Sequence, residues 1–456
     1  MKKTHYFLLT LLVGWISCSE PEEEFSFDPN LQIIFSNDSV TFDTLVSNTR
    51  SSTRRLTVFN PNESALLLSE VSLGLQDGSD YQVIINGKER DAIFNERILG
   101  GDSLLVLIEV TIDPRNEDLP YLVKDSLVFS WNGNSEHVKL VSWGQDARSA
   151  GNELICTTTW TNERPYLISD TLVVGADCIL TIEKGTNIFF ENDAALFVQG
   201  SLIANGDSSE HIIFRNSRFD GIYDEVPGQW NGIFFLEGSD GNELSFTEIF
   251  NGRIGLRVGS PDEDNEPDVV VNNTRIFNMS EAGILAFTSD MEVTNTLIYN
   301  CGTYLAGHFI GGNYTYRHCT FSNDLSFFVS DQPAVQFADN IVLDNNEILS
   351  ADLFFSISNS IIWGRSDEEL LVSSGGGRDV VGLITTNIIR SEQELTGNFT
   401  SVDFNFPGFR NEFPFDYALD SLAFARDKGS NIGVLNDIDD TVRDDLPDIG
   451  AFESVD

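Results

Sequence analysis

Positive charge is scarce in this chain. The 456 residues contain 27 Lys and Arg against 71 Asp and Glu, which gives a formal net charge of −44. No lysine occurs between Lys184 and Lys428. A surface this acidic repels nucleic acid and anionic lipid, so we expect no nucleic-acid partner. It also repels polyuronates and sulfated glycans unless calcium or a local basic patch intervenes.

Cysteine is sparse as well. Apart from Cys18, the chain has only Cys156, Cys178, Cys301 and Cys319. None of them has the CxxC spacing, which argues against a zinc site. Their separations of 22 and 18 residues leave disulfides between stacked neighbours open in an oxidising compartment. We favour buried free thiols instead.

The first 18 residues predict a lipoprotein signal peptide. Two lysines precede an apolar run from Phe7 to Ile16 that is too short to span a bilayer, and Cys18 follows a serine. The segment resembles the lipobox of bacterial lipoproteins, although Trp15 stands where that family usually has leucine. The resemblance implies that Cys18 becomes the lipidated first residue. Ordinary secretion with cleavage nearby is the alternative.

Residues 19–30 form an acidic tether. Its beginning, Ser-Glu-Pro-Glu-Glu-Glu at 19–24, resembles the acidic export signal that sends Bacteroidota-type lipoproteins to the outer face of the outer membrane. The resemblance implies a lipid anchor in the outer membrane and a surface-exposed protein. Several acyl chains, at about 0.8 kcal/mol per buried CH₂, make a firm anchor.

Residues 31–147 alternate between short apolar segments and turns. Residues 55–60 and 104–110 are examples, and Asn-Gly turns fall at 86–87 and 132–133. Short strands at this spacing predict a β-sandwich. Their order resembles immunoglobulin-like domains of the bacterial surface and ASH types, which act as spacers or protein-binding modules.

From residue 152 to 456 the period changes. Six tracts of one shape begin at residues 246, 273, 295, 318, 339 and 359, in steps of 27, 22, 23, 21 and 20 residues. This period is that of stacked solenoid coils. Residues 180–204 and 228–233 resemble the opening coils of right-handed parallel β-helix proteins of the pectin-lyase-like superfamily. Residues 416–453 resemble the closing segment of surface β-helix proteins.

The predicted fold class is therefore all-β: an Ig-like β-sandwich followed by a right-handed parallel β-helix with a C-terminal capping segment. Alternation within the tract directs one face inward. Small residues form one interior column, at Thr247, Thr274, Thr296, Cys319 and Ser360. Large apolar residues form another, at Ile249, Ile276, Ile298, Phe321, Val342 and Ile362. The closing Asn251, Asn278, Asn300 and Asn323 predict an amide ladder at a turn.

The other set of alternating positions in the tract faces outward and forms an aromatic column. It consists of Phe250, Phe277, Tyr299 and Trp363, with gaps at Ser322 and Leu343. Such a column predicts a surface on which sugar rings could stack. Burial by the loops at 219–229 and 260–268, or by the sandwich, is the alternative.

A second cluster lies between residues 299 and 318. Tyr314, Tyr316 and His318 share a face by alternation, and His308 and Arg317 lie nearby. The two tyrosines are candidates for glycan binding, and His308, Arg317 and His318 are candidates for acid–base work. A partly buried polar face without catalysis is the alternative.

The sequence lacks the signatures of enzymes with this fold. Polygalacturonase-like hydrolases carry Asn-Thr-Asp, Gly-His-Gly and Arg-Ile-Lys motifs. Here Asn295-Thr296 is followed by Leu297, Gly307-His308 by Phe309, and no Arg-Ile-Lys occurs. We therefore favour non-catalytic binding of a polysaccharide or a surface protein partner. A polysaccharide lyase or glycoside hydrolase is the alternative, and a structural role in adhesion or assembly is third.

Two acidic loops are candidates for binding calcium. One covers residues 262–268; the other contains Asp437, Asp439, Asp440, Asp444, Asp445 and Asp448. Neither has EF-hand spacing. A solvated loop is the alternative for both.

Overall fold

The computed structural model describes residues 24–89, 92–219, 221–259, 266–324, 326, 328–403, 406–411 and 414–455. The predicted signal peptide, including Cys18, lies outside these residues. The chain divides into two compact units, and each is described separately below. None of the helices within the described ranges is long and apolar enough to cross a membrane.

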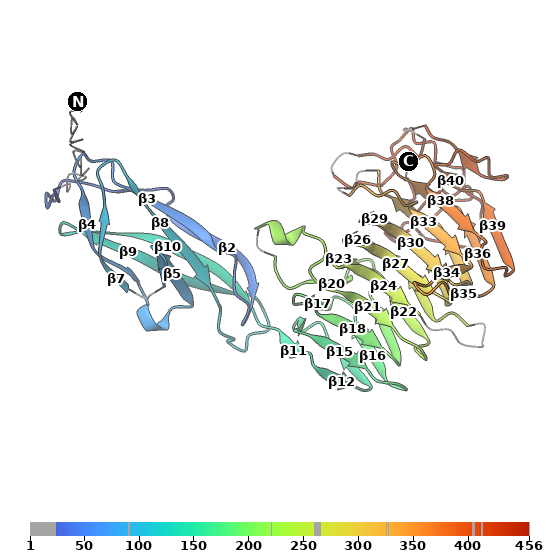
Figure 1. The fold of residues 1–456 in the computed structure, drawn as a ribbon, viewed down its shortest axis with the longest axis horizontal. Coiled ribbons are helices and arrows are strands. Elements are labelled where there is room, and N and C mark those ends of the chain that lie inside the picture. The colour runs from blue at the N-terminus through green and yellow to red at the C-terminus, as the bar shows by residue number, and fades with distance from the viewer. Residues whose placement is uncertain are drawn as a thin grey trace, which may run out of the picture. The chain divides into compact units, whose positions relative to one another are not determined.

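The N-terminal region is an antiparallel sandwich of two five-stranded sheets (Figure 1). One sheet contains β1 (Ile34–Phe35), β3 (Arg54–Phe59), β8 (Ser103–Val110), β5 (Tyr81–Ile85) and β6 (Lys88–Glu89). The other contains β2 (Ser39–Val46), β10 (Asn134–Gln145), β9 (Tyr121–Trp131), β4 (Leu66–Leu73) and β7 (Ala92–Ile98), and a short 3-10 helix, η1 (Gln76–Gly78), follows β4. The rings of Phe35 and Phe129 lie 4.9 Å apart and join the two sheets. The predicted sandwich is confirmed.

Three long parallel sheets follow and form the right-handed β-helix. Sheet 1 has eleven strands: β11 (Arg148–Ala150), β14 (Tyr166–Ile168), β17 (Asn187–Phe190), β20 (Ile212–Asn216), β23 (Thr247–Phe250), β26 (Arg275–Met279), β29 (Leu297–Cys301), β32 (Thr320–Ser322), β37 (Ile361–Trp363), β40 (Ile388–Ile389) and β41 (Phe399–Thr400). Sheet 2 has nine: β12 (Glu153–Ile155), β15 (Thr171–Val174), β18 (Ala195–Val198), β21 (Gly232–Phe235), β24 (Ile254–Val258), β27 (Ala282–Phe287), β30 (Tyr304–Phe309), β33 (Val335–Ala338) and β38 (Leu370–Ser373).

Sheet 3 also has nine strands: β13 (Thr158–Trp160), β16 (Ile179–Glu183), β19 (Ser201–Asn205), β22 (Asn242–Ser245), β25 (Val269–Asn272), β28 (Asp290–Thr294), β31 (Gly312–Arg317), β36 (Leu353–Ser358) and β39 (Val380–Thr385). Nine successive coils contribute one strand to each sheet, and β40 and β41 extend sheet 1 alone. Side chains at the same position of consecutive coils therefore lie in register. A short 3-10 helix, η2 (Gly221–Asp224), lies in the connection between β20 and β21.

The interior columns predicted from alternation are present in sheet 1. Ile249, Ile276 and Ile298 are register partners on consecutive strands and are fully buried. In the small-residue column, the hydroxyls of Thr247 and Thr274 form a hydrogen bond of 3.0 Å. Identical coils therefore fill identical cross-sections of the core.

One of the six tracts is not a coil of sheet 1. Residues 339–344 enter a separate antiparallel hairpin of β34 (Asn340–Val342) and β35 (Ile348–Ser350). Strand β32 pairs directly with β37. Val342, expected inside, has 62% of its surface exposed. The prediction was wrong here because a hairpin strand can carry the same alternation of apolar residues as a coil.

The asparagines at the end of the tract form an amide ladder. The Asn251 amide donates to Asn216, the Asn278 amide to Asn251, and the Asn300 amide to Asn278. The φ angles of Asn251, Asn278 and Asn300 are 63°, 56° and 51°, in the left-handed region that asparagine tolerates. Asn323 departs from the ladder and bonds the backbone of the preceding coil instead.

The four cysteines divide into two pairs of different kinds. Cys156 and Cys178 form a disulfide, so our expectation of free thiols was wrong for them. They lie in the turns after β12 and β15 of neighbouring coils, which brings the two sulfurs together. Cys301 and Cys319 are free and buried, as expected.

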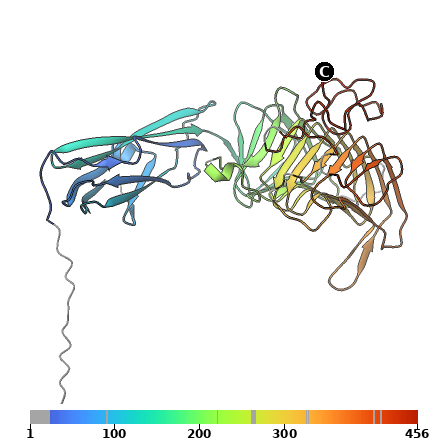
Figure 2. The same cartoon turned by 90° about the horizontal axis from the view of Figure 1, so that it is seen from above.

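The C-terminal segment lies along the side of the β-helix rather than over its open end (Figure 1, Figure 2). The amides of Asn273, Asn295 and Asn359, on three different coils, donate to carbonyls of residues 437, 436 and 430. Leu395, which precedes this segment, packs against the core cluster, as do Val380 and Ile384. The segment therefore braces several coils at once.

We predict that Asn278→Asp lowers the free energy of unfolding by about 3 kcal/mol at neutral pH. Aspartate keeps the shape but cannot donate to the Asn251 side chain or to the Glu225 carbonyl. Asn152→Asp is the matched control, because Asn152 also has a positive φ (51°) but is exposed. Equal losses in urea unfolding would contradict a structural ladder.

Candidate functional site

An aromatic column stands on the outer face of sheet 1. Phe250, Phe277 and Tyr299 are register partners on β23, β26 and β29. Their ring centroids are 4.6 and 4.9 Å apart, with interplanar angles of 8° and 5°. The rings therefore stack on one another along the axis of the β-helix.

This stacking covers the faces of the aromatic rings. Phe277 has a ring on each side. The guanidinium carbon of Arg215 lies 4.8 Å from the centre of the Phe250 ring, and Phe415 and Tyr417 lie 5.2 and 5.3 Å from Tyr299. A ligand beside the column therefore meets ring edges. The expected stacking of sugars on these faces is corrected, because the coil spacing pairs the rings with each other.

The C-terminal segment buries the rest of the column. Tyr417 fills the gap at Ser322 and donates its hydroxyl to the Ser322 carbonyl at 3.3 Å. Trp363 is fully buried, and Phe406 lies 6.0 Å from its ring. Trp363 is thus no part of a surface site. The cover that we had expected from the loops comes here from the C-terminal segment.

A cleft of about 470 Å³ lies beside the part of the column that remains accessible. Its floor is formed by Phe250, Phe277, Tyr299 and the asparagine ladder. Asp224 and Glu225, at and after the end of η2, contribute to one part of the lining, and Pro414 and Phe415 of the C-terminal segment to another. Phe415 has a φ of 63°, a rare conformation for a bulky residue. Sequence reasoning missed the acidic and C-terminal residues because long connections bring them here. It missed Arg215, which occupies on β20 the position that Phe250 occupies on β23, because β20 lies before the first recurring tract.

Two pairs of charged side chains lie in and beside the cleft. Arg215 contacts Asp224 at 2.5 Å. Next to the column, His211 Nδ1 lies 3.0 Å from Glu248. Burial acts to raise the pKa of Glu248, but the hydrogen bond with His211 and the charge of Arg275 outweigh it and hold this pKa below its usual value.

The second predicted cluster is interior. Tyr314, Tyr316 and His308 are buried in the core between sheets 2 and 3. His308 Nδ1 donates to the Gln336 carbonyl at 2.9 Å, so its Nε2 accepts from the Tyr316 hydroxyl at 2.6 Å. Burial lowers the pKa of His308 to about 3. None of the three is accessible to a glycan, because β30 and β31 turn these side chains inward.

Arg317 and His318 point to different environments. Arg317 is half-exposed and pairs with Glu292 at 3.3 Å. His318 is fully buried, and its Nε2 accepts from the Asn359 amide at 2.8 Å. Burial and the charge of Arg443 lower the pKa of His318 to about 3. The three candidates for acid–base work therefore do not share a cleft.

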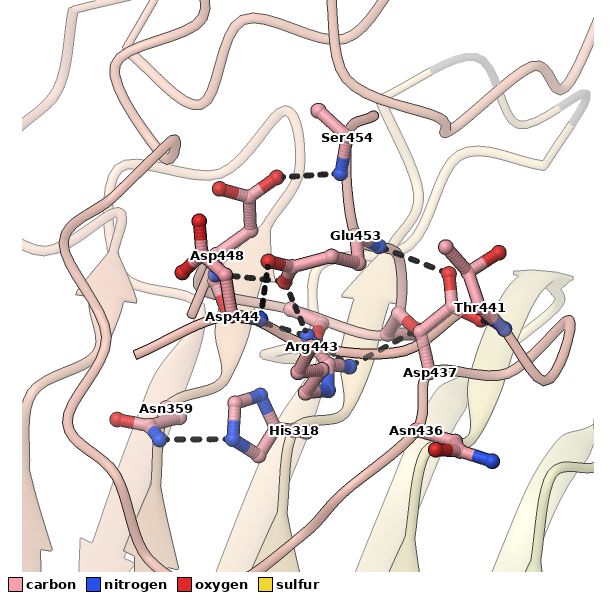
Figure 3. A network of polar contacts seen from close by, with 12 residues as sticks. His318, Asn359, Asn436, Asp437, Thr441, Arg443, Asp444, Asp448, Glu453 and Ser454 are labelled. Atoms are coloured by element: carbon pink, nitrogen blue, oxygen red, sulfur yellow. Dashed lines mark hydrogen bonds and ion pairs between the residues drawn. The ribbon is translucent and has the colours of Figure 1, made fainter. Parts of the chain in front are cut away.

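A buried polar network joins the C-terminal segment to the coils (Figure 3). Arg443 bonds the Glu453 carboxylate at 3.1 Å and the Asn295 side chain at 3.1 Å. Both charged side chains are nearly inaccessible, at 1% and 4% exposure. Burial lowers the pKa of Arg443 and raises that of Glu453.

The predicted calcium ligands mostly serve as acceptors for this segment. Asp437 accepts from the backbone N–H groups of Asp439, Thr441 and Glu453. The remaining ones are engaged likewise or lie in solvent: Asp448 accepts from Asp427 and Ser454, Asp444 from Leu446, Asp440 from Asn436, Asp439 pairs with Arg275, and Asp445 is exposed. Among the described residues, no group of three His, Cys, Asp or Glu is arranged to hold a metal ion. Residues 262–265 of the other acidic loop lie outside them.

Residues 200–378 match the family model described as "Right handed beta helix region". No curated protein matches the chain. Among solved structures, the α-1,3-glucanase catalytic unit from Streptomyces thermodiastaticus is 10% identical over 79% of this chain and 85% of its own, with a TM-score of 0.24.

Two further structures are similar to shorter parts of the chain. The ASH/PapD-like domain of human CEP192 is 14% identical over 32% of this chain and all of its own (TM-score 0.19). A protein of unknown function from Porphyromonas gingivalis W83 is 17% identical over 28% of this chain and 57% of its own (TM-score 0.19). At such identities and TM-scores, these likenesses carry no argument about activity.

We predict that Arg443→Met lowers the free energy of unfolding by about 3–5 kcal/mol, because it leaves the Glu453 carboxylate buried without its partner. Arg253→Met is the matched control. It breaks a pair with Glu281 whose side chains are 49% and 44% exposed, and it should cost at most about 1 kcal/mol. Similar losses for both variants in denaturant unfolding would contradict the role of the buried pair.

Proposed function

We propose that this protein is a surface lipoprotein that binds a glycan, without catalysis, in the cleft beside Phe250, Phe277 and Tyr299. The observation that carries the proposal is the cleft itself. Its volume of about 470 Å³ falls within the range of small-molecule sites, about 300–1,000 Å³. Aromatic edges with a few polar groups are the usual lining of such sites.

Two details support a binding role. The Tyr299 hydroxyl makes no hydrogen bond to any described residue of the chain, so it is available to a ligand hydroxyl. Phe415 is held at a positive φ where it lines the cleft, and strained residues of this kind gather at ligand sites.

A polysaccharide lyase or glycoside hydrolase has less support. His308 and His318 are interior, and Arg317 pairs with a carboxylate away from them. A partner protein and a structural role in adhesion or assembly stay as further candidates. In our proposal the N-terminal sandwich is an Ig-like spacer between the lipid anchor and the β-helix.

We predict that Cys18→Ser abolishes anchoring. The variant should lose incorporation of labelled fatty acid and leave the outer-membrane fraction, because its acyl attachment site is gone. Protease treatment of intact cells should degrade the wild-type protein if it is surface-exposed. Membrane retention of the variant would argue for another anchor, and a wild-type protein without fatty-acid label would argue for ordinary secretion.

For the cleft, we predict that the protein binds at least one neutral oligosaccharide on a glycan array and releases no product from it. Tyr299→Phe should weaken this binding about 3- to 10-fold, which corresponds to one lost hydrogen bond. Its stability should not fall, because the hydroxyl bonds nothing in the described chain.

Tyr304→Phe is the matched control, because Tyr304 lies on sheet 2 and bonds Gln332. Its affinity should equal that of the wild-type protein. Failure to bind any glycan class would refute the proposal, and release of unsaturated uronates or reducing ends would favour the enzyme instead.

A further inference from the structure

We infer that the glycan recognised in the cleft carries free amino groups. This inference rests on the proposed function and goes beyond it by assigning the charge of the ligand. The inference follows from a difference between the charged side chains of the lining: its arginine is paired within the protein, and one of its carboxylates is not paired with any described residue.

Arg215 is the only cation that the described residues contribute to the lining, and it is already engaged. Arg215 contacts the Asp224 carboxylate at 2.5 Å and lies over the rings of Phe219 and Phe250, at 4.6 and 4.8 Å. Only 17% of its side chain is exposed. A carboxylate or sulfate of a ligand would have to displace Asp224 to reach it. The described part of the lining therefore offers no available cation to an anionic sugar.

One carboxylate of the lining is available. The Glu225 side chain is exposed and has no hydrogen bond or ion pair with any residue that the structure describes. An ammonium group donates up to three hydrogen bonds and would neutralise this carboxylate.

The asparagine ladder fixes the backbone that carries this carboxylate. The amide of Asn278 donates to the Glu225 carbonyl at 2.6 Å, and that of Asn251 to the Asp224 carbonyl at 2.8 Å. The backbone that presents the two acidic residues is thus fixed by the coils themselves. Ordering it costs little on binding, which favours affinity.

The negative net charge of the chain also favours binding of an amine-bearing glycan. A chain with a net charge of −44 attracts cations and raises their concentration near its surface. Attraction between exposed charges is screened by salt within about 10 Å at 0.1 M. Binding of an amine-bearing glycan should therefore weaken as the salt concentration rises.

The test compares two trisaccharides with the same linkage and ring. Chitosan trimer carries an amino group at carbon 2, where cellotriose carries a hydroxyl. At low salt and a pH at which the amines are protonated, we expect about tenfold tighter binding of chitosan trimer by calorimetry. Glu225→Gln should remove most of this preference, and the general attraction of the acidic chain should leave a small remainder. Glu237→Gln, which removes an exposed carboxylate outside the cleft lining, should preserve the preference.

The outcomes separate the two proposals. Equal binding of both trisaccharides, or the same effect of both substitutions, would overturn the charge assignment and leave glycan binding intact. Absence of binding by both, together with a negative glycan array, would refute glycan binding itself. Thermal unfolding of Glu225→Gln shows whether the variant is folded, and an unchanged midpoint is expected because the side chain bonds nothing in the described chain.

Discussion

The parallel register of the coils is the constraint on which the rest of the structure depends. Each strand of sheet 1 pairs with its neighbour in the coils before and after it, so every side chain faces its counterparts about 4.8 Å away. Isoleucine on isoleucine fills the core, asparagine on asparagine forms the amide ladder, and aromatic on aromatic stacks. A residue type that gains from contact with a copy of itself is therefore favoured at each position.

The same constraint limits what the outer surface can do. The rings of Phe250, Phe277 and Tyr299 stack on one another across the strand spacing. Their faces therefore stabilise the fold and are not open to a ligand. A ligand site then has to be built from ring edges and from the connections that leave the coils. The ladder contributes to both, because its amides also fix the backbone of residues 224 and 225.

The fold could be predicted where a pattern repeats along the chain. The tracts at 246–300 gave the correct interior columns, since alternation and coil period agree there. Residues 339–344 show the same alternation of apolar and polar residues but belong to a hairpin. The sequence pattern does not distinguish a hairpin strand from a coil strand. For Tyr314 and Tyr316 the shared face was correctly predicted, but alternation alone does not say which face is interior. Phe415 reaches the cleft through non-local packing that carries no local pattern, whereas Arg215 occupies on β20 the outward position that Phe250 occupies on β23.

In so acidic a chain, the positions of a few arginines show where positive charge stabilises the fold. Arg215 and Arg390 lie at the two ends of the aromatic column, over Phe250 and Trp363. Arg443 holds the C-terminal segment through a buried pair. Each of these cations is committed to carboxylates or rings within the protein. Because the arginine of the cleft lining is paired within the protein, the lining presents ring edges, amides and carboxylates, and these favour a neutral or amine-bearing ligand over an anionic one.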